Sequence, residues 1–322
     1  MRGRAAAGSA MRVILAGVLL AASGSQDKVA FRYRFEKGQK LALEIRYSVQ
    51  VKLEKVPEAF QGLLSETPAD LKIEGLLESE VREVAAEGGA ALEGRWRTLR
   101  AKGAWMLGEV DFHHDAEKGA EAGGAKKPSS GESPAVLFDL EEGLRAMARE
   151  TVRFFVEPSG RVRMRSAGAP VVGDMSEQFL SLNGLMGPFP KEPLGKGDSW
   201  KGDEKITMPG VGGAMALAVR SENRYEADEP VGGRSCALLR SKFSVGGEGA
   251  GRKEDPDNPL PFRLKTSGEG EARTWFSPEE GMSARHQGSL RGDLVVGLPD
   301  GGGGEIELRM VLKIEQGYEV KR

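Results

Sequence analysis

Cysteine is almost missing from this sequence, which has one, Cys236, in 322 residues. A single cysteine excludes an intramolecular disulfide and any metal or redox motif that needs a second thiol. Exported proteins often carry disulfides, but a chain of this length can build a core without them. The fold must therefore be held by packing and hydrogen bonding alone.

A basic excess and a rich aromatic content are also lacking. The net charge is −2 at pH 7, whereas a general nucleic-acid binder normally carries a surplus of lysine and arginine. No nucleic-acid partner is expected. Aromatic residues make up only 6%, while 45 glycines predict many tight turns. The shares of apolar (39%) and charged (29%) residues are typical of a soluble protein.

The N-terminus carries one short apolar run, residues 13–22, which is too short to span a bilayer comfortably. Three arginines flank it: Arg2, Arg4 and Arg12. Small residues follow, so we predict a signal peptide at 1–24, cut after Ser23 or Gly24. The protein is then exported, to the periplasm or outside the cell, with no stable membrane span after cleavage. A retained anchor helix is the alternative, and translation could also start at Met11.

Strict alternation of apolar and polar residues dominates the rest of the chain. Apolar side chains occupy every odd position of 41–53, and the even positions of 306–314 repeat the pattern. Period two predicts strands with one buried face. The strands are too many, and the helical segments too few, for βαβ units. We predict a mainly β (α+β) domain over 25–322: a long, strongly curved antiparallel sheet forming an open barrel or half-barrel, with two or three short helices on its apolar face.

Three short helices are expected, within 57–64, within 134–147 and from Asp174 to about residue 186. Two segments, about 114–133 and 246–261, are low in complexity and poor in apolar residues, and they predict flexible insertions in the sheet.

The stretch 174–200 is expected to join two runs of sheet. Asp174 and Glu177 fit a capping box. The helix that they open carries an apolar stripe that could line a ligand cavity: Met175, Phe179, Leu182 and Met186. At the end of the stretch, 197–200 reads Gly-Asp-Ser-Trp, a corner in which Asp198 or Ser199 would close a turn while Trp200 anchors the core.

Residues able to do chemistry are scattered and mostly read as structural. His113 and His114 could bind a metal, but neighbours on a strand point to opposite faces. His286 sits on an apolar face without a nucleophile motif, and Cys236 reads as a small buried residue. The arginines of one predicted hairpin read as a solvated face, although they could recognise an anion: Arg153, Arg161, Arg163 and Arg165. No enzymatic activity, cofactor or metal is expected.

Several short motifs together resemble a family of bacterial exported proteins of unknown function. They are an aromatic opening strand with Lys37-Gly38, a Gly160-Arg161 turn, Phe189-Pro190, the corner at 197–200, and Gly233 followed by Cys236. By architecture alone the chain is also distantly similar to periplasmic lipoprotein carriers, which fold an unclosed barrel over helices and hold acyl chains on its apolar face. That likeness implies a fold and assigns no binding residue.

Two hypotheses for function follow. In the first, the protein is a non-enzymatic binding module that holds an apolar small molecule or lipid between sheet and helices. In the second, it is a structural or protein-interaction domain of the cell envelope with a filled core, and its partner is another envelope protein. A cavity would favour the first hypothesis and a filled core the second.

Overall fold

The computed structural model describes residues 28–57, 69–105, 108–118, 120–123, 140–164, 188–210, 213–252, 261–299 and 305–321. These form one antiparallel 13-stranded sheet and one helix, α1 (Leu140–Arg149). The strands are β1 (Lys40–Lys55), β2 (Ala69–Val84), β3 (Ala90–Trp105), β4 (Gly108–Asp115), β5 (Ala120–Gly123), β6 (Val152–Val156), β7 (Val162–Met164), β8 (Ser199–Gly210), β9 (Gly213–Val231), β10 (Arg234–Arg252), β11 (Pro261–Ser277), β12 (Met282–Pro299) and β13 (Glu305–Lys321).

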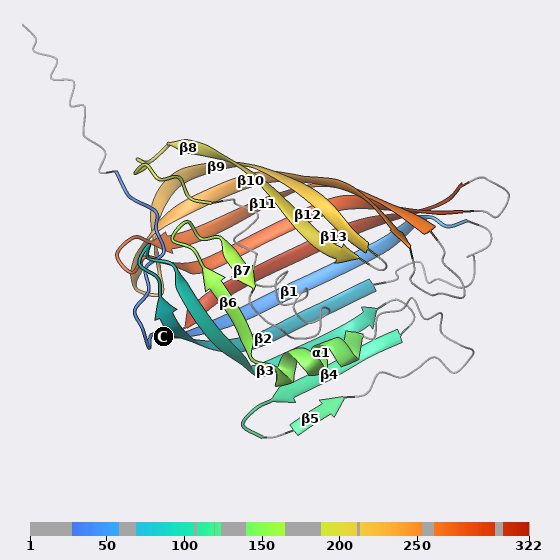
Figure 1. Cartoon of the computed structure of the whole chain (residues 1–322), viewed down its shortest axis with the longest axis horizontal. Helices are drawn as coiled ribbons and strands as arrows, with labels where there is room; N and C mark the ends of the chain where they lie inside the picture. Colours follow the sequence, from blue (N-terminus) through green and yellow to red (C-terminus); the bar gives the residue numbers. More distant parts are fainter. Residues whose placement is uncertain are drawn as a thin grey trace, which may run out of the picture.

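Two meanders make up the sheet, and they meet where the first strand pairs with the last. The strand order is β5-β4-β3-β2-β1-β13-β12-β11-β10-β9-β8, with β6 paired to β3 and β7. The seam between β1 and β13 keeps one register from Ala42↔Lys321 to Leu53↔Met310. The edge strands β5 and β8 are not paired with each other in the described residues, so the sheet curls without closing (Figure 1). The prediction of an open, strongly curved antiparallel sheet is confirmed.

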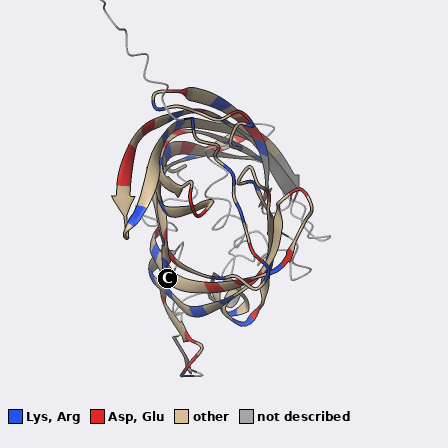
Figure 2. Ribbon diagram, turned by 90° about the vertical axis from the view of Figure 1, so that its left-hand side faces the viewer, with Lys and Arg blue, Asp and Glu red and all other residues tan. Residues whose placement is uncertain are grey.

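Side-chain alternation gives the sheet an apolar inner face and a charged outer face. On β1, Ile45, Val49 and Val51 are buried inside, while Glu44 and Arg46 on the outer face form an ion pair. Successive side chains of a strand point to opposite faces, so this pattern fixes which face curls inward. In the end-on view the sheet curls round its interior, and charged residues are spread along its strands (Figure 2).

The inner face of the first meander is covered by elements of its own half. Helix α1 packs against β3 and β4 and buries Leu144 and Met147 completely. The hairpin of β6 and β7 extends the sheet beside β3, and Phe154 and Val156 of β6 are buried in the same core (Figure 1). One helix is described where two or three were expected. The expected helices at 57–64 and 174–186 lie outside the described residues, apart from Pro57.

One end of the curled sheet is closed by aromatic packing. Phe31 meets Tyr225 and Phe276 edge-on, with ring centroids 5.3 and 5.7 Å apart. Phe189 stacks on Tyr33 at 5.9 Å. From the β6–β7 turn, Arg161 reaches across to an ion pair with Glu204 on β8. Segments far apart in sequence therefore seal this end together.

Both expected insertions are partly strand. β4 continues to Asp115 and β5 covers Ala120–Gly123, inside the first expected insertion. β10 continues to Arg252, well into the second, with Gly246 opposite Ser267 and Gly249 opposite Leu264. The prediction of loops there was wrong because it counted side chains to bury. The hydrogen bonds between neighbouring strands are made by backbone N–H and C=O groups, which glycine supplies as well as any other residue.

Candidate functional site

A polar band crosses the inner face of the second meander, on an otherwise apolar surface. It follows one row of directly paired residues from β1 to β8: Tyr47, Gln316, Gly288, Ala272, Ser241, Asn223 and Trp200. The adjoining row contributes His286 and Thr274, which are also paired. Part of the band satisfies itself, since Ser241 donates to Asn223 Oδ1 and Asn223 Nδ2 donates to Ser221 Oγ.

His286 is fully buried in the band, with 0% of its surface exposed. Its ring stacks on Tyr318, with centroids 5.5 Å apart, and its Nδ1 lies 2.8 Å from Thr274 Oγ1. Burial lowers the pKa of His286 to about 4, so the imidazole is neutral at pH 7. Burial likewise raises the pKa of Tyr47 to about 12, which keeps the phenol protonated. These two members of the band are therefore uncharged at neutral pH.

Three nitrogens of the band lack a hydrogen-bond partner in the part of the chain that the structure describes. They are His286 Nε2, Gln316 Nε2 and Trp200 Nε1, and all three atoms are buried. Buried polar groups are normally paired, and each unpaired group costs roughly 1–3 kcal/mol. The first two atoms lie near each other, since a Cβ on Gly288 would lie 3.4 Å from each of them.

Glycines line this part of the inner face. Most of them are required because a neighbouring atom lies too close to allow a Cβ. A Cβ on Gly270 would lie 2.4 Å from the Phe243 ring, and one on Gly292 would lie 2.4 Å from the Ser267 carbonyl oxygen. Gly268 meets backbone and side-chain atoms at 3.0 Å. Gly288 differs, because a methyl group there would make only ordinary van der Waals contacts. A side-chain methyl group bonded to its Cα would therefore fit.

An apolar lane runs from Gly288 along β12 and β13 toward the far ends of these strands. Its side chains are half-buried, apart from the buried Met310: Leu290, Leu294, Val296, Leu308, Met310, Leu312 and Ile314. From Gly288 to Val296 the lane is roughly 26 Å long at the usual strand rise. The polar band thus lies at one end of a partly exposed apolar strip.

A separate cavity lies near the closed end, among Tyr33, Leu41, Phe154, Met282 and Tyr318. Its volume is about 80 Å³, whereas ligand pockets usually measure about 300–1,000 Å³. This end is therefore essentially filled.

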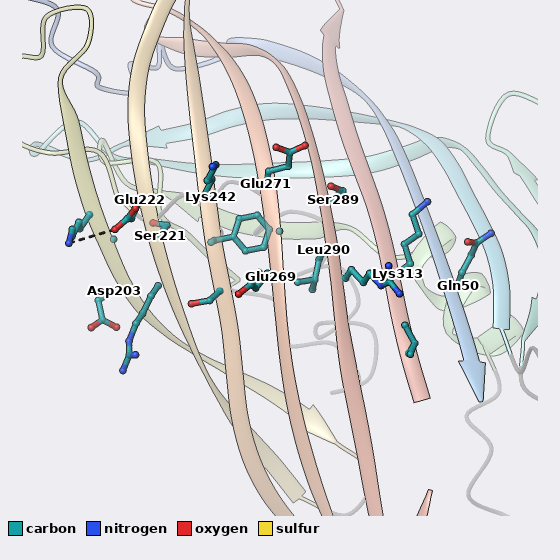
Figure 3. Close-up of a pocket in the computed structure, with 18 of the residues that line it drawn as sticks. Gln50, Asp203, Ser221, Glu222, Lys242, Glu269, Glu271, Ser289, Leu290 and Lys313 are labelled. Carbon is teal, nitrogen blue, oxygen red and sulfur yellow. Dashed lines mark ion pairs between the residues drawn. The ribbon is translucent and has the colours of Figure 1, made fainter. Parts of the chain in front are cut away.

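A depression with a volume of about 1180 Å³ lies on the outer face (Figure 3). The depression is shallow. Side chains of opposite charge lie next to each other on neighbouring strands along it, for example Glu269 beside Arg291 and Lys201 beside Glu222. The Lys201–Glu222 pair, dashed in Figure 3, measures 3.7 Å between side chains that are 83% and 76% exposed. We interpret the depression as the solvated side of the sheet.

The residues predicted to line a ligand cavity, Met175, Phe179, Leu182 and Met186, all lie outside the described residues. His113 is exposed and His114 half-buried on β4, and no group of three potential metal ligands occurs in the described part of the chain. Cys236 is buried as predicted, and burial raises the pKa of its thiol, which disfavours the nucleophilic thiolate.

The predicted arginine face is neutralised where it is described. Arg153 pairs with Glu93, Arg161 with Glu204, and Arg163 with Glu157. Arg165 lies outside the described residues. This arrangement fits a solvated face better than an anion site.

The Gly-Asp-Ser-Trp corner has the expected structural role. Asp198 Oδ2 accepts a hydrogen bond from the Gly195 N–H at 2.9 Å, and Gly197 adopts φ 89°, a conformation that favours glycine. Trp200 packs edge-on to Phe189. Asp198 rather than Ser199 closes this turn.

Gln316 and Gly288 were not singled out from sequence. The signal for Gln316 was present, because it interrupts the run of apolar even positions from Ile306 to Tyr318. Gly288 could not have been found, since its neighbours across the sheet are distant in sequence.

Comparison with known proteins gives little guidance. Neither protein-family models nor curated proteins match the chain. Among solved structures, it is similar to OmpT, an outer membrane protein of Vibrio cholerae, at 11% identity and a TM-score of 0.21, over 91% of this chain and 100% of that one. The trimer form of OmpT gives 9% identity and a TM-score of 0.19, over 89% of this chain and 100% of the other. Scores this low carry no argument about function. Among the helical residues described, none form a helix long and apolar enough to cross a membrane.

Proposed function

We propose that this protein is an exported, non-enzymatic binding module of the cell envelope that holds an apolar or amphipathic small molecule against the inner face of β10–β13. One observation carries the proposal. On that face, glycines and half-buried apolar side chains lie beside two buried nitrogens, His286 Nε2 and Gln316 Nε2, that have no hydrogen-bond partner among the described residues. Buried polar groups are normally paired, so unpaired nitrogens beside half-buried apolar side chains support a bound molecule on this face.

Export is supported by the predicted signal peptide at 1–24. The charged outer face supports a water-facing sheet. The sequence carries no nucleophile motif, which supports binding rather than catalysis.

The alternative is an interaction or structural domain with a filled core. It is favoured by the closed end, where the cavity of about 80 Å³ is too small for a lipid. The two functions differ in what they predict for β12 and β13, because a filled core would bind no added ligand.

Titration with N-phenyl-1-naphthylamine, an uncharged apolar fluorophore, tests the proposal. We expect saturable binding by the wild type and a loss of about tenfold in Leu312→Gln, since that change removes apolar contact worth roughly 1.5 kcal/mol. Val311→Gln is the matched control, because Val311 directly precedes Leu312 on β13 and points to the outer face. Absence of saturable binding, or equal losses in both variants, would support the filled core instead. Native mass spectrometry after mild purification would identify a lipid that co-purifies.

A further inference from the structure

Two strand edges of the curled sheet are linked across its opening by a single ion pair. In the described residues β8 pairs only with β9, and β7 pairs only with β6, so each strand has one edge without a strand partner. Arg161 lies in the turn that leads into β7, and its Nη2 is 2.5 Å from Glu204 Oε1 on β8. The pair therefore joins the first meander to the free edge of the second.

Glu204 is a carboxylate on the inner face of the sheet. It lies directly opposite Val219, which is 2% exposed, and its own side chain is only 16% exposed. Inward-pointing charges are one of the devices that protect an edge strand, but a largely buried carboxylate needs a cation. Arg161 supplies that cation from the other edge, and its hydrogen bond with Glu204 raises the pKa of Arg161 above the ordinary value. The closed arrangement of the two edges thus depends on Arg161.

The two joints between the meanders differ in kind. On one side, β1 and β13 are joined by backbone pairing from Ala42↔Lys321 to Leu53↔Met310. On the other side, the Arg161–Glu204 pair joins side chains, and 43% of the Arg161 side chain is exposed to water and salt. Phe189 adds an apolar contact next to this pair, edge-on to Trp200. Backbone pairing makes the seam the natural hinge, while the side-chain joint can separate without breaking a strand pair.

The position of this joint matters for access to the inner face. The half-buried apolar side chains of β12 and β13 face the interior of the curl. The closed end is filled by aromatic side chains, among them Phe31 and Phe276 at 0–1% exposure. The line between β7 and β8, in contrast, is held in the described residues without strand pairing.

We propose that the Arg161–Glu204 ion pair is a clasp that controls the entry of an apolar or amphipathic ligand to the inner face, with the β1–β13 seam as the hinge. This inference rests on the proposed function and adds a control of the same site. Opening the clasp lets the two edges separate, and closing it encloses the ligand against β10–β13.

The rates of ligand binding test the clasp. Stopped-flow mixing of the mature chain with N-phenyl-1-naphthylamine should show association and dissociation that are both about fivefold faster in Arg161→Ala, with Kd changed less than about twofold. Arg163→Ala is the matched control, because Arg163 pairs with Glu157 at the same 2.5 Å but within the hairpin. It should change neither rate. Equal rates in the two variants would overturn the inference.

A charge swap separates the clasp from a general effect on folding. Arg161→Glu should accelerate binding at least as much as Arg161→Ala, and adding Glu204→Arg should restore rates close to those of the wild type. Salt at about 0.5 M should accelerate the wild type and leave Arg161→Ala unchanged, because screening acts on the ion pair. Failure of the swap to restore slow binding would count against the clasp.

A covalent lock gives the opposite change. Arg161→Cys and Glu204→Cys, joined by a short bismaleimide in a Cys236→Ala background, should slow association at least about tenfold relative to the same protein before cross-linking. If the locked protein binds the fluorophore as fast, the ligand enters elsewhere, and the inference is wrong while the proposed function stands. If the wild type does not bind the fluorophore, the proposed function fails, and the inference fails with it.

Discussion

The two meanders bury their inner faces by different means. On β2 and β3 the inner face is filled by large apolar side chains such as Leu77, Trp96 and Leu99, which are 0–3% exposed. Trp96 even covers the one bare backbone position of β2, Gly75. On β11 and β12 the corresponding face holds Thr274, His286 and glycines, and the apolar side chains beyond them are only half-buried.

This difference separates a well-covered half from a partly exposed half within one continuous sheet. In the first meander α1 packs against β3 and β4, and buried side chains of α1 and β6 join the same apolar cluster, so its inner face is a core in the ordinary sense. No described helix covers β9–β13, and polar groups interrupt that face. One sheet can therefore supply a rigid scaffold at one side and an adaptable surface at the other.

The largest expected effect comes from truncating the filled half. Leu77→Ala should lower the free energy of unfolding by about 3–5 kcal/mol, because Leu77 is fully buried among residues that cannot collapse into the gap. Leu294→Ala, on the half-buried lane, should cost only about 1 kcal/mol. Equilibrium unfolding in urea measures both losses. Losses of the same size would remove the contrast between the meanders.

A fall in pH should destabilise the second meander through His286. Its pKa is lowered by burial to about 4, against about 6.5 in the unfolded chain, so the unfolded state takes up the proton first. The stabilisation is complete above pH 6.5 and is lost as the pH falls toward 4, by roughly 3 kcal/mol. Carboxylates with lowered pKa, such as Glu44 and Asp228, also lose stabilisation on acidification.

His286→Gln separates these contributions. The variant keeps the carboxylate effects and should lose the part of the pH dependence between 6.5 and 4 that belongs to the imidazole. Urea titrations at several pH values give the two curves. Parallel curves for wild type and variant would show that the imidazole does not titrate as its burial requires.

Much of the fold could be predicted from sequence because alternation is a local signal. The pattern at 41–53 predicts β1, and the pattern at 306–314 predicts the central part of β13. The turn between β6 and β7 and the corner at Asp198 could also be predicted, because glycine and aspartate determine the conformation of the backbone next to them. A curled antiparallel sheet then follows from many strands with one apolar face.

The remaining features depend on contacts that sequence order hides. The stretch 174–200 lies between the two runs of sheet along the chain, as expected, but the hydrogen-bonded seam between β1 and β13 that also joins them was not foreseen. The pair of His286 Nε2 and Gln316 Nε2 exists only because β12 and β13 adopt one register. The length of β10 was missed because glycine-rich strands lack the apolar signal that identifies other strands.

A moderate effect is expected at the closed end, which belongs structurally to both meanders. Asp198→Ala removes the acceptor of the Gly195 N–H and should cost about 1 kcal/mol, as for other turn-closing hydrogen bonds. Asp203→Ala is the control. Asp203 is an exposed residue of β8, so its replacement should change stability little. Thermal unfolding of both variants checks the difference. A negligible effect of Asp198→Ala would mean that the aromatic packing alone fixes this corner.

The smallest effect is expected on the outer face, where the two meanders do not differ. Lys201 and Glu222 are both largely exposed and 3.7 Å apart, so water and salt screen their attraction. Lys201→Ala should change the free energy of unfolding by less than about 0.5 kcal/mol, and a double-mutant cycle with Glu222→Ala should give a coupling of similar size. A coupling well above about 1 kcal/mol, or a loss of ligand binding in either variant, would show that the outer depression takes part in packing or recognition. The division between a solvated outer face and a selective inner face would then be wrong.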